Sequence, residues 1–331
     1  MAEEENWVLD PSAKTNPAHG CNPYDRSLGE LLECGVIIID KPPGPTSHQL
    51  TAWARNLLGI ARIGHGGTLD PFATGLLTLL CGRATRLTAV LLQKPKRYIA
   101  VLRFKDEVDK DRISDLLDSL TGETYNVPPK ESAVKVQVRT RVIRLAQLVD
   151  VDDASRVFVV SFHCDAGTYV RTLAKDIGLL MGTGCELLEL HREGTGGFDD
   201  SMACTMQQLT DAAFLWREHD EDRGLARILV PVESILDDLP RIVVKDGAVA
   251  ALSYGAPLAR PGIVSAPKGL PVGSSALISS LKGEVVALAT LSVATDSLPG
   301  MKTGQVATAQ TVMMPSGVYP QTWQTWTKEQ S

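Results

Sequence analysis

The sequence predicts an α+β protein in two parts, a larger domain with a mixed β-sheet and a smaller β-barrel-like module after it. Up to about residue 239, strand-like and helix-like apolar patterns mix without strict βαβ alternation. From Pro240 onward, short apolar runs are separated by Gly/Pro turns. The length of 331 residues allows about two domains.

The N-terminal 34 residues are polar and turn-rich, and predict an extended arm. Gly35 then opens a buried strand over residues 36–39. The Pro-rich run at 42–45 stops this strand, because proline cannot donate to a sheet ladder. The arm therefore leads directly into the first core strand.

Two helices are expected around a glycine-rich loop. Ser47 is a suitable N-cap for an amphipathic helix that ends at Gly59. The loop follows at 64–67, and the apolar residues after Pro71 predict a second helix. Asp70 would cap that helix, with Pro71 at its first position.

The rest of the chain supplies further strands and helices. Alternating or continuous apolar patterns predict strands at 97–104, 157–164 and 285–291. The 3.6-residue period predicts a helix at 109–120 and another that carries Val170, Leu173, Ala174 and Ile177. These elements complete the mixed sheet and its covering helices.

Composition excludes several classes of protein. No apolar run approaches the ~18 residues that a membrane span requires, and the acidic N-terminus predicts no secretory signal. The six cysteines are scattered, which predicts free thiols in a reducing cytoplasm. Neither HExxH nor a Cys/His cluster is present, so we expect no metal site.

Charge is unevenly distributed. The net charge is −6 overall, but +3 from Arg241 onward. Two basic islands interrupt the acidic part; they are Lys94, Lys96, Arg97, Arg103 and Lys105, and Lys130, Lys135, Arg139, Arg141 and Arg144. Either island is a solvated face or part of a phosphate-contacting surface.

Some residues that could carry chemistry have ordinary structural interpretations too. The loop at 64–67 matches neither GxGxxG nor the P-loop, so we expect no dinucleotide site. Asp70 is either a helix cap or a functional carboxylate. Arg171 lies at a helix N-terminus, where its charge opposes the helix dipole, which suggests a carboxylate partner elsewhere. Tyr98 and Tyr169 are core aromatics or catalytic groups.

Four motifs in order resemble those of the TruB family of pseudouridine synthases. They are GVIIIDKPPGPTSH at 35–48, GHGGTLDP at 64–71 with ATG at 73–75, KRY at 96–98, and AGTYVRTL at 166–173. The segment HREGTGGF at 191–198 is similar to a further family motif that is usually more basic, and Glu193 stands where positive charge is usual.

The resemblance extends over nearly the whole chain. The arm, the residues PP at 128–129 and SAVK at 132–135, and the C-terminal module are similar to the dyskerin-type branch, in archaea and eukaryotes. It implies an arm at 1–34, a pseudouridine synthase catalytic domain at 35–239, and an RNA-binding PUA domain at 240–326. A lysine-rich tail of the eukaryotic kind is missing, which favours an archaeal source.

The resemblance also implies the catalytic residues. Asp70 would be the nucleophile of an isomerisation that needs no cofactor, because the reaction is neither redox nor group transfer. Arg171 would pair with Asp70 and offset the burial of its carboxylate. Tyr98 would stack on the flipped uracil and use its hydroxyl in proton transfer.

Four further residues are expected to bind substrate. Tyr169 and Val170 would line the pocket. His65 would hold the flipped nucleotide or order its own loop. Lys41 would support the catalytic loop or contact a phosphate.

The resemblance implies an enzyme that forms pseudouridine in rRNA and tRNA, guided by H/ACA RNA and helped by small accessory proteins. A stand-alone tRNA pseudouridine-55 synthase is one alternative. A non-catalytic RNA-binding scaffold is another, and the presence of Asp70, Tyr98 and Arg171 argues against it.

Overall fold

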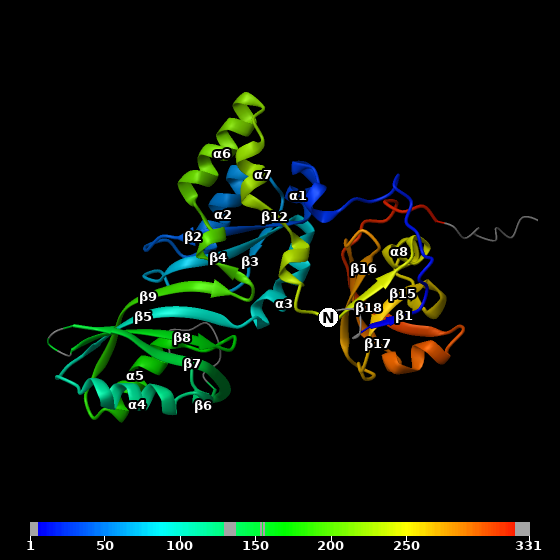
Figure 1. Ribbon diagram of the computed structural model, residues 1–331. Helices are drawn as coiled ribbons and strands as arrows, with labels where there is room; N and C mark the ends of the chain where they lie inside the picture. Colours follow the sequence, from blue (N-terminus) through cyan, green and yellow to red (C-terminus); the bar gives the residue numbers. More distant parts are fainter. Residues whose placement is uncertain (1–5, 129–136, 153, 155, 322–331) are drawn as a thin grey trace, which may run out of the picture. The chain divides into compact units, whose positions relative to one another are not determined.

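The structure is a computed structural model that describes residues 6–128, 137–152, 154 and 156–321 (Figure 1). Contacts divide the chain into two compact units. One is Gly35–Leu229, and the other combines the chain up to Cys34 with the chain from Val230 onward. Part of the second basic island, at Lys130 and Lys135, and the end of the predicted PUA domain lie outside the described residues.

The larger unit is built on a mixed sheet with the strand order β11-β2-β4-β9-β5-β8-β7-β6. Pairing is antiparallel between β2 and β4 and between β5 and its two neighbours, but parallel between β4 and β9. The short strands β3 and β10 pair with β4 and β9. The strands are β2 (Gly35–Lys41), β3 (Ile63–His65), β4 (Thr74–Cys81), β5 (Lys96–Phe104), β6 (Gly122–Asn126), β7 (Arg139–Val151), β8 (Val157–Cys164), β9 (Cys185–Thr195), β10 (Phe198–Asp199) and β11 (Cys204–Thr205).

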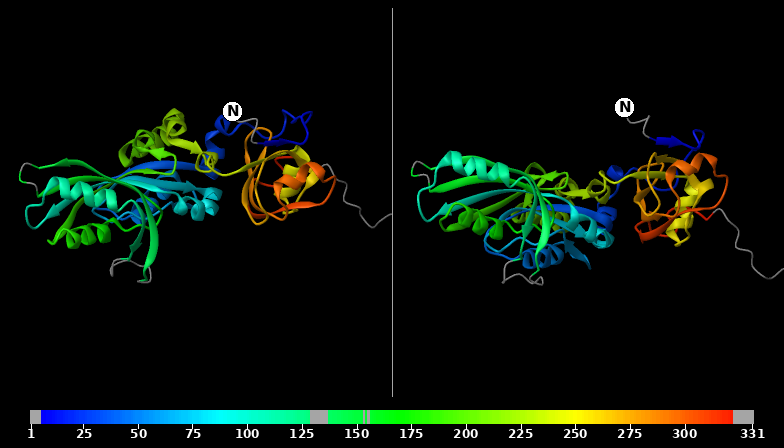
Figure 2. Two further views of the ribbon diagram at one scale, coloured as in Figure 1. Left: turned by 60° about the horizontal axis from the view of Figure 1, so that its bottom comes forward. Right: turned by 90° about the horizontal axis from the view of Figure 1, so that it is seen from below.

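Helices pack against this sheet at two places (Figure 1, Figure 2). Helices α4 and α5 contact β7 and β9, while α2 and α6 pack together near β2. The helices of this unit are α2 (Ser47–Leu58), α3 (Thr88–Gln93), α4 (Lys110–Ser119), α5 (Val170–Leu180), α6 (Met206–His219) and α7 (Arg223–Ile228). Strand β12 (Leu229–Pro231) follows at the junction of the two units in the sequence.

Several elements agree with the sequence pattern. Strand β8 has the expected bounds, β5 begins one residue early, and α4 lies within the expected range. Gly59 ends α2 with a φ of 66°, the left-handed conformation that glycine adopts without strain. Thr46 caps this helix through a capping box with Gln49, so the prediction of Ser47 as the N-cap was wrong by one residue.

The helix predicted after Pro71 is wrong. The chain turns at Pro71 and then forms strand β4, so Asp70 is not a helix cap. A short, continuous apolar run suits either a buried strand or a buried helix, and periodicity alone does not separate them. Here β2 lies on one side of β4, with β9 and β3 on the other, and the backbone groups pair across them.

The second unit contains a seven-stranded sheet with the order β1-β15-β13-β16-β17-β18-β14, which agrees with the predicted β-rich C-terminal module. Its core is apolar and includes Ile242, Ile278 and Val286. Its elements are β1 (Asn6–Val8), α1 (Leu28–Cys34), β13 (Arg241–Val244), α8 (Asp246–Ser253), β14 (Leu258–Ala259), β15 (Ile263–Pro267), β16 (Ser275–Ser280), β17 (Val285–Leu291) and β18 (Gln305–Val312).

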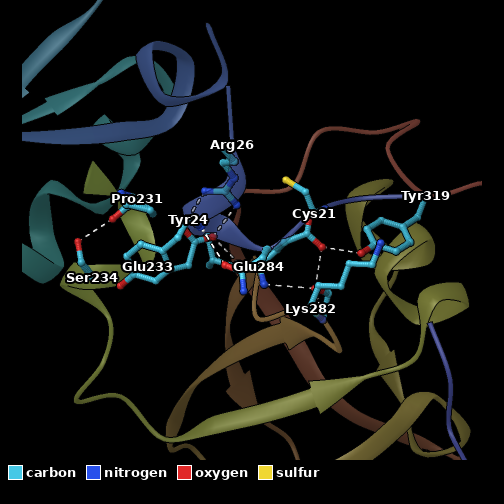
Figure 3. A network of polar contacts seen from close by, with 12 residues as sticks. Cys21, Tyr24, Arg26, Pro231, Glu233, Ser234, Lys282, Glu284 and Tyr319 are labelled. Atoms are coloured by element: carbon cyan, nitrogen blue, oxygen red, sulfur yellow. Dashed lines mark hydrogen bonds and ion pairs between the residues drawn. The ribbon is translucent and has the colours of Figure 1, made fainter. Parts of the chain in front are cut away.

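The N-terminal arm is part of this second unit and is more structured than expected. Its strand β1 pairs antiparallel with β15, and it ends in helix α1. Arg26 donates two hydrogen bonds of 2.7 Å to the carboxylate of Glu233 (Figure 3). The Lys282 ammonium donates to the carbonyl oxygen of His19 at 2.6 Å. These buried and half-buried polar contacts attach the arm to the β-module.

No helix in the described part of the chain combines the length and the apolar character needed to cross a bilayer. No disulfide joins any of the six cysteines, all of which lie among the described residues.

Candidate active site

The loop that carries Asp70 runs between β3 and β4, and hydrogen bonds hold it on both sides. The Ser47 hydroxyl accepts from the Leu69 amide at 2.9 Å and donates to the Leu69 carbonyl at 3.3 Å. The Gly66 amide donates to the carbonyl oxygen of Thr78 at 2.9 Å. The backbone that leads to Asp70 is therefore fixed by the start of α2 and by β4.

Lys41 supports the same loop from beneath. Its side chain is fully buried, and its ammonium donates to the carbonyl oxygens of Pro42, Pro71 and Ala73 at 2.9, 3.1 and 2.7 Å. Burial lowers the pKa of Lys41, and the charge of Asp70 counteracts this decrease. Of the two roles expected for Lys41, these contacts are those of loop support.

Asp70 forms an ion pair with Arg171, with 2.5 Å between a carboxylate oxygen and a guanidinium nitrogen. Arg171 is the second residue of α5, so its charge, unfavourable at a helix N-terminus, is balanced by a carboxylate from another element. It also lies 5.6 Å from the centre of the Phe72 ring. The Asp70 side chain is 41% exposed, so the expectation of a buried carboxylate was wrong.

Tyr98 lies in β5 and is 9% exposed. It belongs to the apolar cluster that includes Leu69 and Val170, the residues that precede Asp70 and Arg171. Burial raises the pKa of Tyr98, so the phenol keeps its proton near neutral pH, although the charge of Arg192 opposes the rise. One cluster thus underlies all three predicted catalytic residues.

The predicted substrate-binding residues have different environments. Val170 is 4% exposed and packs in the core. Tyr169 precedes α5, and its amide donates to the Asn126 side chain at 2.8 Å. His65 lies in β3, with its ring 4.8 Å from the ring of His48.

The imidazole of His65 is neutral near pH 7. Burial lowers its pKa, and the charges of His48 and Arg192 lower it further. Its Nδ1 is buried without a hydrogen-bond partner among the described residues. A neutral ring with an unpaired nitrogen is suited to a polar contact with a bound nucleotide.

The first basic island is not a continuous surface. Lys96 is 5% exposed, and its ammonium donates to the carbonyl oxygens of Leu91, Leu92 and Lys94. Lys94 is buried too, whereas Arg97 is exposed. Both interpretations of this island required exposed side chains, so both were wrong for these two lysines. The pattern failed because β5 alternates buried and exposed positions, and Lys96 falls on the buried side.

Sequence reasoning missed Arg192 as a site residue. It lies in β9 opposite Tyr98 and is 2% exposed. Its Nε donates to the carbonyl oxygen of Leu76 at 2.7 Å, and its Nη2 donates to that of Gly67 at 3.2 Å. The only signal in the sequence was a motif between 191 and 198, which does not say that the side chain points inward.

Family models cover most of the chain. They are the DKCLD domain at residues 1–51, the N-terminal domain of the TruB family pseudouridylate synthase at 55–170, the tRNA pseudouridylate synthase B C-terminal domain at 171–237, and the PUA domain at 240–313. A protein of Methanosarcina barkeri named probable tRNA pseudouridine synthase B is 40% identical over 97% of this chain and 94% of its own length. The chain belongs to the TruB family of pseudouridine synthases.

Other comparisons agree. A protein of the same name from Pyrobaculum calidifontis is 40% identical over 93% of this chain and 92% of its own length. The archaeal box H/ACA sRNP Nop10-Cbf5 complex contains a chain with a TM-score of 0.88 and 35% identity, covering 96% of this chain and 98% of that one. A chain of a Cbf5-Nop10-Gar1 complex is 35% identical with a TM-score of 0.89, and the match covers 96% of this chain and 96% of that chain.

The geometry suits the chemistry of this family. The Asp70 carboxylate is accessible, is oriented by Arg171, and lies on a loop that Lys41 and Ser47 hold from below. A carboxylate with these properties can act as a nucleophile. Within the described residues, no group of three His, Cys, Asp or Glu side chains is placed to hold a metal ion.

Proposed function

We propose that this TruB-family enzyme isomerises uridine in RNA at Asp70, and that an H/ACA guide RNA selects the target. The ion pair between Asp70 and Arg171 carries the catalytic half of the proposal. In this pair the Asp70 carboxylate is accessible and oriented, and it lies above the cluster that contains Tyr98. The full-length likeness to chains solved in H/ACA particles supports the guided half.

The reaction assigns a task to each group. The N1–C1′ bond of uridine breaks, the uracil turns, C5 joins C1′ and loses its proton, and N1 gains a proton, so the product is an isomer of uridine. The carboxylate of Asp70 acts covalently or assists formation of a glycal. The target base must leave its stack, and Tyr98 offers an aromatic face and a protonated hydroxyl. His65 offers a neutral imidazole, and Tyr169 and Val170 directly precede Arg171.

The proposed partners are H/ACA guide RNA, its rRNA and tRNA substrates, and small accessory proteins. The similar structures are of complexes that contain Nop10, Gar1 or a substrate RNA, which supports this proposal. We propose the domain division 1–34, 35–239 and 240–326, supported by family models that change between residues 237 and 240. The six free cysteines fit our proposal of a cytoplasmic location in an archaeal cell.

A second candidate is stand-alone modification of tRNA. The names of the curated relatives, probable tRNA pseudouridine synthase B, favour it. Both candidates use the same carboxylate and differ only in how the uridine is chosen. A non-catalytic scaffold is disfavoured, because it would have no need of the ion pair between Asp70 and Arg171.

The deciding experiment measures pseudouridine yield with the full-length protein. The experiment compares two substrates, one that matches the guide and one that carries mismatches to it. Each substrate is tested with guide RNA and accessory proteins and also without them, which gives four reactions. We expect product only from the matched substrate with guide and partners. A tRNA fragment without guide is tested in parallel, and Asp70→Asn is the inactive control. Equal yield from matched and mismatched substrates without guide, together with a modified tRNA fragment, would establish stand-alone action instead.

A further inference from the structure

We propose that Arg192 is a positioning residue for the isomerisation, and that it holds the catalytic loop and the Tyr98 hydroxyl in one fixed geometry. The inference rests on the proposed roles of Asp70 and Tyr98. Arg192 itself does not contact the reacting atoms.

The sheet places Arg192 between two strands of the site. Strand β9 pairs with β4 on one side, where Arg192 is opposite Gly75, and with β5 on the other, where it is opposite Tyr98. Directly opposite residues in neighbouring strands project to the same face, so the guanidinium lies on the face that carries the Tyr98 ring. This position is set by backbone pairing and does not depend on a flexible loop.

Gly75 permits the close approach of β4 to β9. A Cβ at this glycine would lie 2.5 Å from the carbonyl oxygen of Arg192 and 2.8 Å from its nitrogen, closer than real contacts allow. The φ angle of Gly75 is also +92°, a conformation that other residues rarely adopt. Gly75 therefore belongs to the same arrangement as Arg192.

The guanidinium connects both ends of the catalytic loop. Gly67 is three residues before Asp70, and Leu76 is six residues after it; Arg192 donates to the carbonyl oxygens of both. Arg192 also interacts with the Tyr98 hydroxyl: burial raises the pKa of Tyr98, and the neighbouring guanidinium opposes this rise. Three directions from one rigid, planar group match the fork geometry of arginine, which a lysine ammonium does not reproduce.

The electrostatic setting is unusual for a purely structural residue. The buried guanidinium donates to neutral carbonyl groups, and no carboxylate among the described residues lies within ion-pair distance of it. Its positive charge lowers the pKa values of Lys41, His65 and Lys96. Burial of a charge without a counterion is unfavourable, so an apolar side chain would serve the fold better. The contacts with the loop and Tyr98 give a functional reason for arginine.

The test is a double-mutant cycle in single-turnover rates, with Arg192→Lys, Tyr98→Phe and the double variant in the full-length protein. In the wild-type background, we expect Arg192→Lys to lower the single-turnover rate about 100-fold, the effect of a small misplacement of catalytic groups. RNA affinity should stay within about two-fold, because Arg192 is away from solvent. In the Tyr98→Phe background the same change should have a smaller effect, since the hydroxyl is already absent and only the hold on the catalytic loop remains to be lost.

The control is Leu209→Ala in α6, a buried core change in the same unit that lies outside the cluster of Tyr98 and lowers the melting temperature without reaching the site. It should leave the single-turnover rate near wild type below its melting range. If Arg192→Lys lacks the near-UV circular dichroism of the wild type, Arg192→Gln replaces it in the cycle, since it keeps an amide donor. Equal rate losses in both backgrounds, or a folded variant with wild-type rate, would overturn the proposal. The cycle uses whichever RNA the wild type modifies, so an error in the guide assignment changes the substrate and not the comparison.

Discussion

Replacing Lys41 by methionine tests how the catalytic loop is held. Methionine is similar to lysine in length and is apolar, so it fills the same space but removes the ammonium donor shared by the carbonyl oxygens of Pro42, Pro71 and Ala73. The loop between β3 and β4 should then lose its support from beneath. We expect the variant to be both less stable and much slower.

The magnitude follows from the three contacts. The bond to Ala73 is buried, and the other two are partly buried. Each carbonyl left without a donor costs about 1–3 kcal/mol when buried. The Pro71 carbonyl oxygen keeps the Gly44 amide as a donor at 2.8 Å, so it adds less to the cost. Removing the buried ammonium group, whose pKa is lowered by burial, also removes the cost of burying its charge, and this offsets part of the lost stability. We expect a net loss of about 2–3 kcal/mol, or roughly 4–12 °C in melting temperature for a domain of this size.

The assay combines thermal unfolding with single-turnover pseudouridine formation. The rate below the melting range should fall about 100-fold, because Asp70 would no longer be held in position. Lys110→Met, at an exposed position in α4, is the matched control and should change stability by less than about 0.5 kcal/mol. A Lys41→Met protein that melts within about 1 °C of the wild type and keeps its rate would refute the reasoning.

Four further predictions follow from the site. Asp70→Asn is nearly isosteric and should abolish pseudouridine formation while RNA affinity in a filter-binding assay is retained; turnover above background would contradict the nucleophile assignment. Tyr98→Phe keeps the stacking face and should bind RNA normally but react slowly in single turnover, whereas an unchanged rate would exclude the hydroxyl. Burial and the charge of Arg192 lower the pKa of Lys96 from 10.5 to about 8. Between these pH values the unfolded state binds more protons than the folded state. The free energy of unfolding should therefore rise with pH by up to about 3 kcal/mol relative to Lys96→Met. Denaturant unfolding of both proteins at pH 8 and at pH 10.5 checks the direction of this change. Activity should survive EDTA once the RNA is folded, and loss restored by zinc but not by magnesium would count against a metal-free reaction.

The sequence by itself determined most elements that carry the site. The continuous apolar run of β2, the alternation of β5 and the helical period of α5 each reflect local burial, which a linear pattern records. The unfavourable position of Arg171 even indicated a carboxylate partner. It did not say which carboxylate, and only the family motifs singled out Asp70.

Local signals failed where neighbours in space decided the outcome. The apolar residues after Pro71 form β4 because strands on both sides pair with their backbone. Lys96 was taken as part of a basic island, yet its ammonium is buried against three carbonyl groups at the end of α3. A charged side chain is normally expected to be exposed. No local sequence pattern shows that backbone carbonyl groups will accept hydrogen bonds from its ammonium group.

Tertiary structure alone decided how the catalytic residues are supported. Arg192 is opposite Tyr98 through strand pairing between β5 and β9, and it reaches the catalytic loop across β4. Lys41 finds its acceptors about thirty residues further along the chain. Such contacts depend on register and on the packing of strands that are distant in sequence, so they leave no periodic signal. The sequence determined which residues could react, and the fold determined which residues hold them in place.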